Sequence, residues 1–320
     1  PTRRSSDLPI ILDVDMGVDD ALAIMLALQS PEVELLGIST VFGNVPLNQA
    51  TRNALQVLEL MGRDEIPVYV GAGEPLVRKL VHAAAVHGES GLGDAVLPDP
   101  EMLPAGNALD FLIEGIQARP GEVIVVATGP LTNLALVEKK QPGILDQARR
   151  VLVMGGALAE AGNITPVSEF NSFADPHAFH QLIKAETNMS LIPLDVTHQL
   201  GLAAETIAAR LAGRDDAIAR FIRESTRTVI AFEQEHYNYA GVHLHDPAAV
   251  ALGIDSSLFE METLVLDVET MGELTTGQVV VDRRPFSDEE ERQGYPVDCA
   301  MKVDVDRLMH MFEHRVLGGE

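Results

Sequence analysis

Residues 10–28, IILDVDMGVDDALAIMLAL, decide the fold of this 320-residue chain. The segment begins with a short apolar run, turns at Gly17, and continues with apolar residues at helical spacing. A strand, a tight turn and a helix in this order indicate the start of a parallel α/β sheet. The turn contains Asp13, Asp15, Asp19 and Asp20, at the carboxyl end of the strand, where open α/β sheets bind ligands. We expect Asp19 or Asp20 to cap the helix.

Short apolar runs alternate with helical segments along most of the chain. Strands are predicted at 10–13, 35–40, 67–70, 123–127, 151–154 and 190–194, and helices at 20–29, 47–61, 107–118, 131–140 and 176–185. A long polar helix is predicted at 215–235, antiparallel strands at 263–269, 278–282 and 297–303, and a last helix at 305–317. The pattern predicts one α/β domain over residues 9–320, with a mostly parallel, Rossmann-like central sheet flanked by helices and a C-terminal helical and antiparallel elaboration. Residues 1–8, PTRRSSDL, are expected to be a disordered or non-native leader.

The composition excludes several classes of partner. The chain has 48 acidic and 23 basic residues, a formal net charge of −25, which would repel nucleic acid and anionic membranes. A single cysteine, Cys299, excludes an internal disulfide and a multi-cysteine zinc site, and it fits a cytoplasmic location. We expect no membrane span and no signal peptide, because no apolar run approaches the roughly 18 residues that a span needs.

The four aspartates of the first turn predict a metal site. Carboxylates this close together repel one another unless a cation compensates them, and their oxygens suit Ca²⁺ or Mg²⁺. An EF-hand loop starting at Asp13 is excluded, because Val18 would replace its glycine and Ile24 its glutamate. Two alternatives to a metal site are weaker here: a metal-dependent Asp-x-Asp phosphatase, which expects Thr or Val where Gly17 stands, and a solvated turn in which the aspartates only cap the helix.

The motifs in this chain resemble those of the inosine-uridine-preferring nucleoside hydrolase family, whose signature is Asp-x-Asp-Pro-Gly-x-Asp-Asp. Here residues 13–20 read DVDMGVDD, and Met16 replaces the proline, which we expect to change the stiffness of the turn and no ligand. Seven further motifs follow in the same order: TVFGN (40–44), HGESGLG (87–93), ATGPLTNLA (127–135), VMGGA (153–157), GNITPVSEFN (162–171), LDVTHQ (194–199) and HDPAAVA (245–251). The resemblance covers nearly the whole chain after Leu8.

The resemblance implies a bound Ca²⁺ and a ribose site. The implied metal ligands are Asp15, Asp20, the backbone carbonyl of Thr128, and Asp246. The residues implied to contact the ribose hydroxyls are Asp19, Asn44, Asn163, Glu169 and Asn171. Taken alone, Thr128 reads as an ordinary strand-to-helix turn, and polar residues in glycine-rich loops are more often turn formers than ligands.

The resemblance also implies how the bond to the base is broken. Asp15 would take a proton from a water activated by Ca²⁺, and His245 would protonate the departing base. His87 is placed near the base, and Tyr237 is within reach of the same pocket. Met154 packs either against the sugar or in the core.

We therefore expect a Ca²⁺-dependent enzyme that hydrolyses ribonucleosides to ribose and free base. The alternative is a non-catalytic nucleoside or ribose binder on the same fold, which the presence of both Asp15 and His245 disfavours. The chain contains no tryptophan, so it cannot grip a purine between indoles as purine-specific members of the family do. This places it with members that accept inosine, uridine or cytidine. His198 is expected to be structural, and the family resemblance implies a homodimer or homotetramer.

Overall fold

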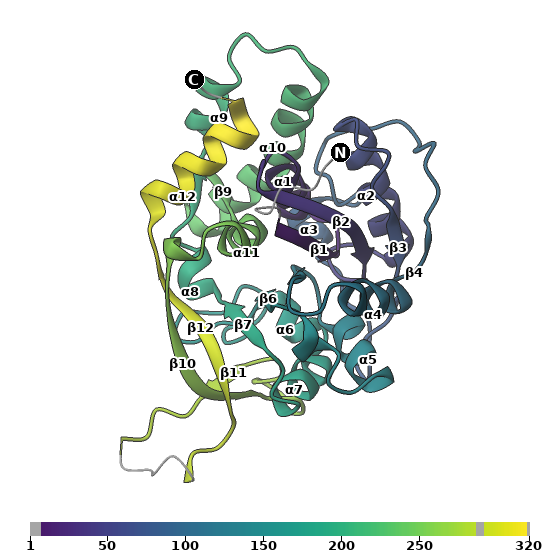
Figure 1. The fold of residues 1–320 in the computed structure, drawn as a ribbon. Helices are drawn as coiled ribbons and strands as arrows, with labels where there is room; N and C mark the ends of the chain where they lie inside the picture. The colour runs from purple at the N-terminus through teal and green to yellow at the C-terminus, as the bar shows by residue number, and fades with distance from the viewer. Residues whose placement is uncertain (1–7, 286–290, 319–320) are drawn as a thin grey trace.

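A mostly parallel sheet forms the centre of the computed structural model, which describes residues 8–285 and 291–318 (Figure 1). The strands are β1 (Leu8–Val14), β2 (Val33–Thr40), β3 (Val68–Val70), β4 (Gly106–Asn107), β5 (Ile124–Ala127), β6 (Arg150–Met154), β7 (Met189–Ile192), β8 (Gly201–Ala203), β9 (Gly241–His243), β10 (Phe259–Val268), β11 (Val279–Val281) and β12 (Tyr295–Val303). In the described residues the large sheet has the order β11-β10-β12-β7-β6-β5-β1-β2-β3-β4, and β8 pairs with β9 separately. Pairing is parallel from β12 to β4, whereas β10 is antiparallel to both β11 and β12.

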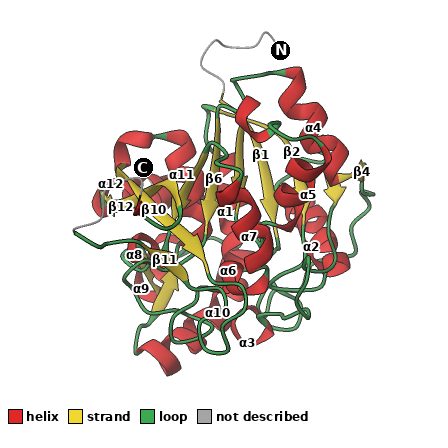
Figure 2. Ribbon diagram, turned by 90° about the horizontal axis from the view of Figure 1, so that it is seen from below, coloured by secondary structure: helices red, strands yellow, loops and turns green. Residues whose placement is uncertain are grey.

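Helices cover both faces of this sheet (Figure 2). They are α1 (Val18–Leu28), α2 (Leu47–Leu60), α3 (Ala84–His87), α4 (Ala108–Ala118), α5 (Thr132–Lys140), α6 (Phe170–Ala174), α7 (Pro176–Lys184), α8 (Leu194–Thr197), α9 (Ala204–Arg210), α10 (Ala217–Tyr237), α11 (His245–Ile254) and α12 (Val305–Phe312). Alternate residues of a strand point to opposite faces. Accordingly, Ile10 and Leu12 of β1 pack in a cluster with α1, α2 and α11, whereas Ile11 packs in a second cluster with α4, α5 and α7.

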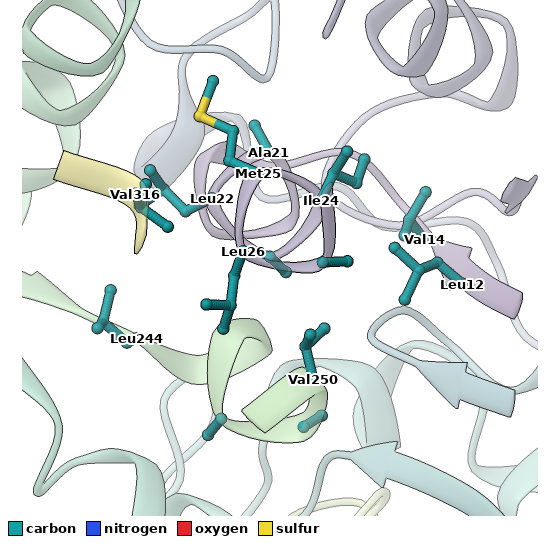
Figure 3. Packing of buried hydrophobic residues seen from close by; sticks show 14 of the residues in the cluster. Leu12, Val14, Ala21, Leu22, Ile24, Met25, Leu26, Leu244, Val250 and Val316 are labelled. Carbon is teal, nitrogen blue, oxygen red and sulfur yellow. The ribbon is translucent and has the colours of Figure 1, made fainter. Parts of the chain in front are cut away.

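The helix that follows the first strand is buried on nearly all sides. Residues of α1 pack against β1 and against α11, and Leu26 points from α1 toward Val250 of α11 (Figure 3). The uniformly apolar sequence of α1 fits this position, because a helix that is hydrophobic all round belongs in a core. The packing fixes both ends of the turn that contains the aspartates.

The predicted fold class is confirmed: the chain forms one α/β unit with a largely parallel central sheet between helices. The long helix predicted at 215–235 is α10, and the three C-terminal strands pair as expected, although β12 also joins the parallel part of the sheet through β7. Among the described residues, no helix has the length and apolar character of a membrane span.

Several predicted boundaries were wrong. The strand predicted at 190–194 ends at Ile192, because Pro193 has no N–H to continue the ladder and caps α8. Leu8, assigned to the leader, begins β1 and pairs with Val33, while residues 1–7 lie outside the described residues. The cap of α1 is Gly17, and the Asp20 carboxylate instead accepts a hydrogen bond from the Gly17 N–H at 2.7 Å.

Replacing Leu26 with alanine should lower the free energy of unfolding by about 2–5 kcal/mol, because the side chain is fully buried between α1 and α11 and its removal leaves a cavity. Urea denaturation measures this change. The matched control is Leu103→Ala, since Leu103 is 82% exposed and should change stability by less than about 0.5 kcal/mol. Equal effects of the two substitutions would contradict the described core.

Candidate active site

A cavity of about 700 Å³ opens at the carboxyl edge of the parallel strands. The predicted site residues that line it are Asp19, Asn44, His87, Thr128, Met154, Asn163, Glu169, Asn171, Tyr237, His245 and Asp246. They come from the end of β6, from the loops that follow β2, β5 and β6, and from helices α1, α3, α6, α10 and α11, so distant segments of the chain converge there. In the described structure no lysine or arginine lines this cavity.

Asn44 joins two of the predicted carboxylates to the cavity wall. Asp15 and Asp20 are fully buried behind the lining residues. The backbone N–H of Asn44 donates to Asp15 Oδ2 at 2.7 Å, and its side-chain amide donates to Asp15 Oδ1 at 3.1 Å and to Asp20 Oδ2 at 3.3 Å. Both acids therefore have fixed orientations that depend on one loop after β2.

Asp20 also holds the loop after β5. The hydroxyl of Thr128 donates to Asp20 Oδ1 at 2.6 Å, and the Thr128 backbone N–H bonds the carbonyl of Asp13. The Thr128 carbonyl accepts a hydrogen bond from the Asn171 amide at 2.7 Å. A carbonyl oxygen has two lone pairs, so this oxygen keeps the capacity to bind a second group.

Three carboxylates form the group best suited to a cation. One oxygen from each of Asp19, Asp20 and Asp246 lies within 4.8 Å of the other two. Burial raises the pKa of Asp246 well above its usual value, and the charges of the neighbouring aspartates raise it further. The pKa of Asp15 is also raised well above its usual value, first by burial and then by the charge of Asp20.

A divalent cation fits this acidic group. In addition to the raised pKa values, Asp19 Oδ1 is buried and has no hydrogen-bond partner in the part of the chain that the structure describes. The carboxylates of this group and the Thr128 carbonyl offer hard oxygen atoms, and no lysine or arginine of the described residues lines the cavity to balance their charge. The residues present thus fit a divalent metal ion.

Asp13 lies apart from this group, although the sequence placed it with the other three aspartates. Its Oδ1 accepts hydrogen bonds from Ser39 at 2.5 Å and from Asn133 at 2.7 Å, which belong to β2 and α5. Burial raises the pKa of Asp13 to about 6. Asp13 therefore ties β1 to its neighbours behind the site.

The turn between β1 and α1 has little freedom. Met16 has a φ of 53°, a left-handed conformation that is uncommon for a residue other than glycine, and its side chain is fully buried. Proline cannot adopt this φ, so the departure from the family signature affects the backbone path and not only its stiffness. Gly43 faces the turn, and a side chain there would collide with the Asp15 carboxylate.

Glu169 and its neighbours form the part of the cavity wall that follows β6 in the chain. The Glu169 side chain caps α6 and accepts hydrogen bonds from the backbone N–H groups of Asn171 at 2.7 Å, Gly156 at 2.8 Å and Ser172 at 3.0 Å. Burial raises the pKa of Glu169 against the opposing effect of these donors. Asn163 accepts a hydrogen bond from the Phe170 N–H at 2.9 Å. Both predicted ribose contacts thus also have structural roles.

Thr197 orients His245. The Thr197 hydroxyl lies 2.8 Å from His245 Nδ1, and either group has the capacity to donate. Burial lowers the pKa of His245 well below its usual range, and the charges of three nearby histidines lower it further. The ring is therefore neutral near pH 7.

His87 also lies in the cavity wall as a neutral ring. Its Nδ1 accepts a hydrogen bond from the Val18 N–H at 3.2 Å, so a neutral ring carries its proton on Nε2. Burial lowers its pKa to about 4. The ring lies beside the start of α1, and its Nδ1 atom is 3.9 Å from Asp19 Oδ1.

Sequence reasoning missed part of the cavity wall. His198, predicted to be structural, lines the cavity, and its ring centroid is 5.6 Å from that of His245. Further lining residues without a predicted role are His82, Phe232, Glu233, Tyr239 and His243. Glu233 gave no signal because it falls within a long, mostly polar helix, whereas β8 and β9 were too short for their pairing to be predicted.

Comparisons with known proteins give one consistent result. The sequence model described as "Inosine-uridine preferring nucleoside hydrolase" matches residues 10–310. The chain is 39% identical to the inosine-uridine preferring nucleoside hydrolase of Crithidia fasciculata, and the match covers 93% of this chain and 94% of the relative. It is 38% identical to the pyrimidine-specific ribonucleoside hydrolase RihA of Shewanella woodyi, with the same coverage. The solved structure of the purine-preferring ribonucleoside hydrolase from Gardnerella vaginalis has a TM-score of 0.89 and 34% identity, covering 97% of this chain and 98% of that one.

Addition of Ca²⁺ to protein freed of metal by a chelator should raise the melting temperature, because the cation relieves repulsion that exists only in the folded state. At a hundredfold excess over the dissociation constant the stabilisation is ~2.7 kcal/mol. Differential scanning calorimetry measures the shift.

Two variants in and beside α11 test whether Ca²⁺ binds at the acidic group or stabilises the protein through a general effect of charge. Asp246→Asn removes one acid of the group and should reduce the Ca²⁺ response. Asp255→Asn makes the same change at the C-cap of α11, at a partly exposed residue outside the acidic group, and Ca²⁺ should raise its melting temperature as much as it does for the unmodified protein. Equal responses of the two variants would show that Ca²⁺ binds elsewhere.

Proposed function

This chain belongs to the inosine-uridine preferring nucleoside hydrolase family and is a ribonucleoside hydrolase, and we propose that it uses Ca²⁺ and water to cleave inosine, uridine and cytidine into ribose and free base. The observation that carries the proposal is the meeting of buried carboxylates with a neutral histidine in one cavity. Because the chain belongs to this family, the alternative that it is an Asp-x-Asp phosphatase is excluded.

The proposed metal ligands are Asp15, Asp20, Asp246 and the carbonyl of Thr128. The chemistry of these four donors supports the assignment: all are oxygen atoms, and among the described residues no lysine or arginine lines the cavity to balance the negative charge. When bound, Ca²⁺ supplies positive charge that lets the carboxylates ionise together and lowers the pKa of a nearby water molecule.

Asp15 is the proposed general base. It accepts the proton of the attacking water at a carboxylate oxygen, and the two hydrogen bonds from Asn44 hold that carboxylate in one orientation. A raised pKa supports this role, because a base whose pKa is closer to the working pH accepts a proton more readily.

His245 is the proposed acid. The ring is neutral at rest and acts as an acid after it takes up a proton. In that imidazolium form Nδ1–H donates to the Thr197 hydroxyl oxygen, and transfer of the Nε2 proton to the departing base leaves the ring neutral again; the lowered pKa makes the imidazolium a stronger acid. His87, whose neutral ring carries its proton on Nε2, is the proposed second contact to the base. Tyr237, 47% exposed at the end of α10, is proposed to close over the base from the solvent side.

The proposed ribose contacts are Asp19, Asn44, Asn163, Glu169 and Asn171, with Met154 against the sugar. Glu169 uses its carboxylate for three backbone donors, which fixes its position and leaves acceptor capacity for a hydroxyl. We also propose a homodimer or homotetramer in the cytoplasm, on the basis of the family resemblance and the single cysteine.

The purified protein should release ribose from uridine, inosine and cytidine. Excess chelator should abolish this release and Ca²⁺ should restore it. 2′-Deoxyuridine should react slower by orders of magnitude, because the buried polar groups of the ribose site lose a partner. A reducing-sugar assay measures all of these rates. A non-catalytic binder would release no ribose. Equal kcat/KM for uridine and 2′-deoxyuridine would contradict the proposed contacts to the ribose hydroxyls.

His245→Ala should reduce kcat on uridine by about 10²–10⁴-fold, since general acid catalysis is typically worth that much. It should slow p-nitrophenyl riboside much less, because p-nitrophenolate leaves without protonation. Thr197→Val should follow the same pattern more weakly, while Thr197→Ser keeps the hydroxyl and should resemble the unmodified enzyme. Equal losses of His245→Ala on both substrates would mean that His245 maintains the site and that another residue, with His87 the next candidate, is the acid.

A further inference from the structure

Glu233 is a buried acid in the cavity wall that the proposed mechanism does not use. It lies on α10, lines the cavity and is 7% exposed. Its Oε2 atom is buried and has no hydrogen-bond partner among the described residues. The Nδ1 atom of His243 is 3.2 Å away but is not aligned for a hydrogen bond. Burying an acceptor without a hydrogen-bond partner costs free energy, and a ligand that donates a hydrogen bond to Oε2 would recover that cost.

The position of Glu233 places it on the side of the cavity where the base would leave. His243 lies between Glu233 and His245: it contacts the carboxylate, and its ring centroid is 5.8 Å from that of His245. The charge of Glu233 reaches both tyrosines at this end, because it contributes, after burial, to the raised pKa of Tyr237 and of Tyr239. The charge of Glu233 also acts on His87, the second proposed contact to the base, and on Asp19.

An ionised carboxylate only accepts hydrogen bonds. The exocyclic amino groups of cytosine and adenine donate hydrogen bonds, whereas the exocyclic oxygens of uracil and hypoxanthine only accept them. A base with an amino group facing Oε2 would therefore satisfy it. A base with an oxygen at the same position would place two acceptors against each other, and it would have to shift in the cavity to present its neighbouring ring N–H to the carboxylate. No lysine or arginine of the described structure lines the cavity to relieve that repulsion.

We propose that Glu233 reads the exocyclic group of the base and favours amino over keto nucleosides, cytidine over uridine and adenosine over inosine. The inference rests on the proposed function, because it concerns the selection of substrate at that same cavity. Uracil and cytosine differ as leaving groups, so the effect of Glu233 is defined as the change in the cytidine-to-uridine ratio of kcat/KM that its replacement causes.

Glu233→Gln is the deciding variant. A glutamine amide rotates to present either its oxygen or its N–H, so it serves both kinds of base. The cytidine-to-uridine and adenosine-to-inosine ratios should each fall by roughly ten- to hundredfold, the factor expected for a hydrogen bond to a charged group. Glu235→Gln makes the same change of charge at an exposed residue of the same helix and should leave both ratios unchanged.

The outcomes separate this inference from the proposed function. Cleavage of nucleosides by folded Glu233→Gln with unchanged ratios would overturn the role of Glu233 alone. Failure of the unmodified enzyme to cleave any of the four nucleosides or p-nitrophenyl riboside would overturn the proposed function and this inference with it. If Glu233→Gln does not fold, inhibition of the unmodified enzyme by the free bases decides: cytosine should inhibit at a concentration at least roughly tenfold lower than uracil, and equal inhibition would overturn the proposal.

Discussion

Repulsion between buried carboxylates is the constraint on which the site depends. Asp15, Asp20 and Asp246 are almost completely removed from water, and Asp19 stands beside them. The protein surrounds them with neutral donors, such as the Asn44 amide and the Thr128 hydroxyl, which orient the carboxylates without cancelling their charge. The negative charge of these carboxylates therefore has to be balanced by a cation from solution. The electrostatic potential in the cavity differs strongly between the metal-free and the metal-bound protein.

The sheet order explains how such a costly arrangement is held together. β1 lies between β2 and β5, so the turn that carries the acids is flanked by the loops that carry Asn44 and Thr128. Behind the turn, α1 is locked into the core against α11, whose first turn supplies Asp246. Hydrophobic packing over both helices offsets the unfavourable burial of charge at their ends.

The sequence predicted the sheet and the acidic turn because both are local patterns. Apolar runs alternating with helical periods specify a parallel sheet, and its carboxyl edge is where a ligand is expected. The motifs then identified many of the polar residues that line the cavity. Local patterns do not report pairing between distant short segments, so the position of His198 was missed. Local patterns also do not show which of two neighbouring acids faces the site. The sequence therefore placed Asp13 in the metal site with Asp15, whereas the structure shows its carboxylate accepting hydrogen bonds from Ser39 and Asn133.

Met16 has a consequence for the history of this turn. Its left-handed backbone conformation is closed to proline, whose ring holds φ near −65°. Exchange between methionine and the proline of the family signature is therefore not a neutral step, because each residue requires its own path for the chain between β1 and α1. Glycine accepts both backbone conformations, so it is the residue that this position would tolerate with either path. A homologous turn transplanted into this protein would for the same reason have to bring its own neighbours, including the loop around Gly91, which packs against the Met16 carbonyl.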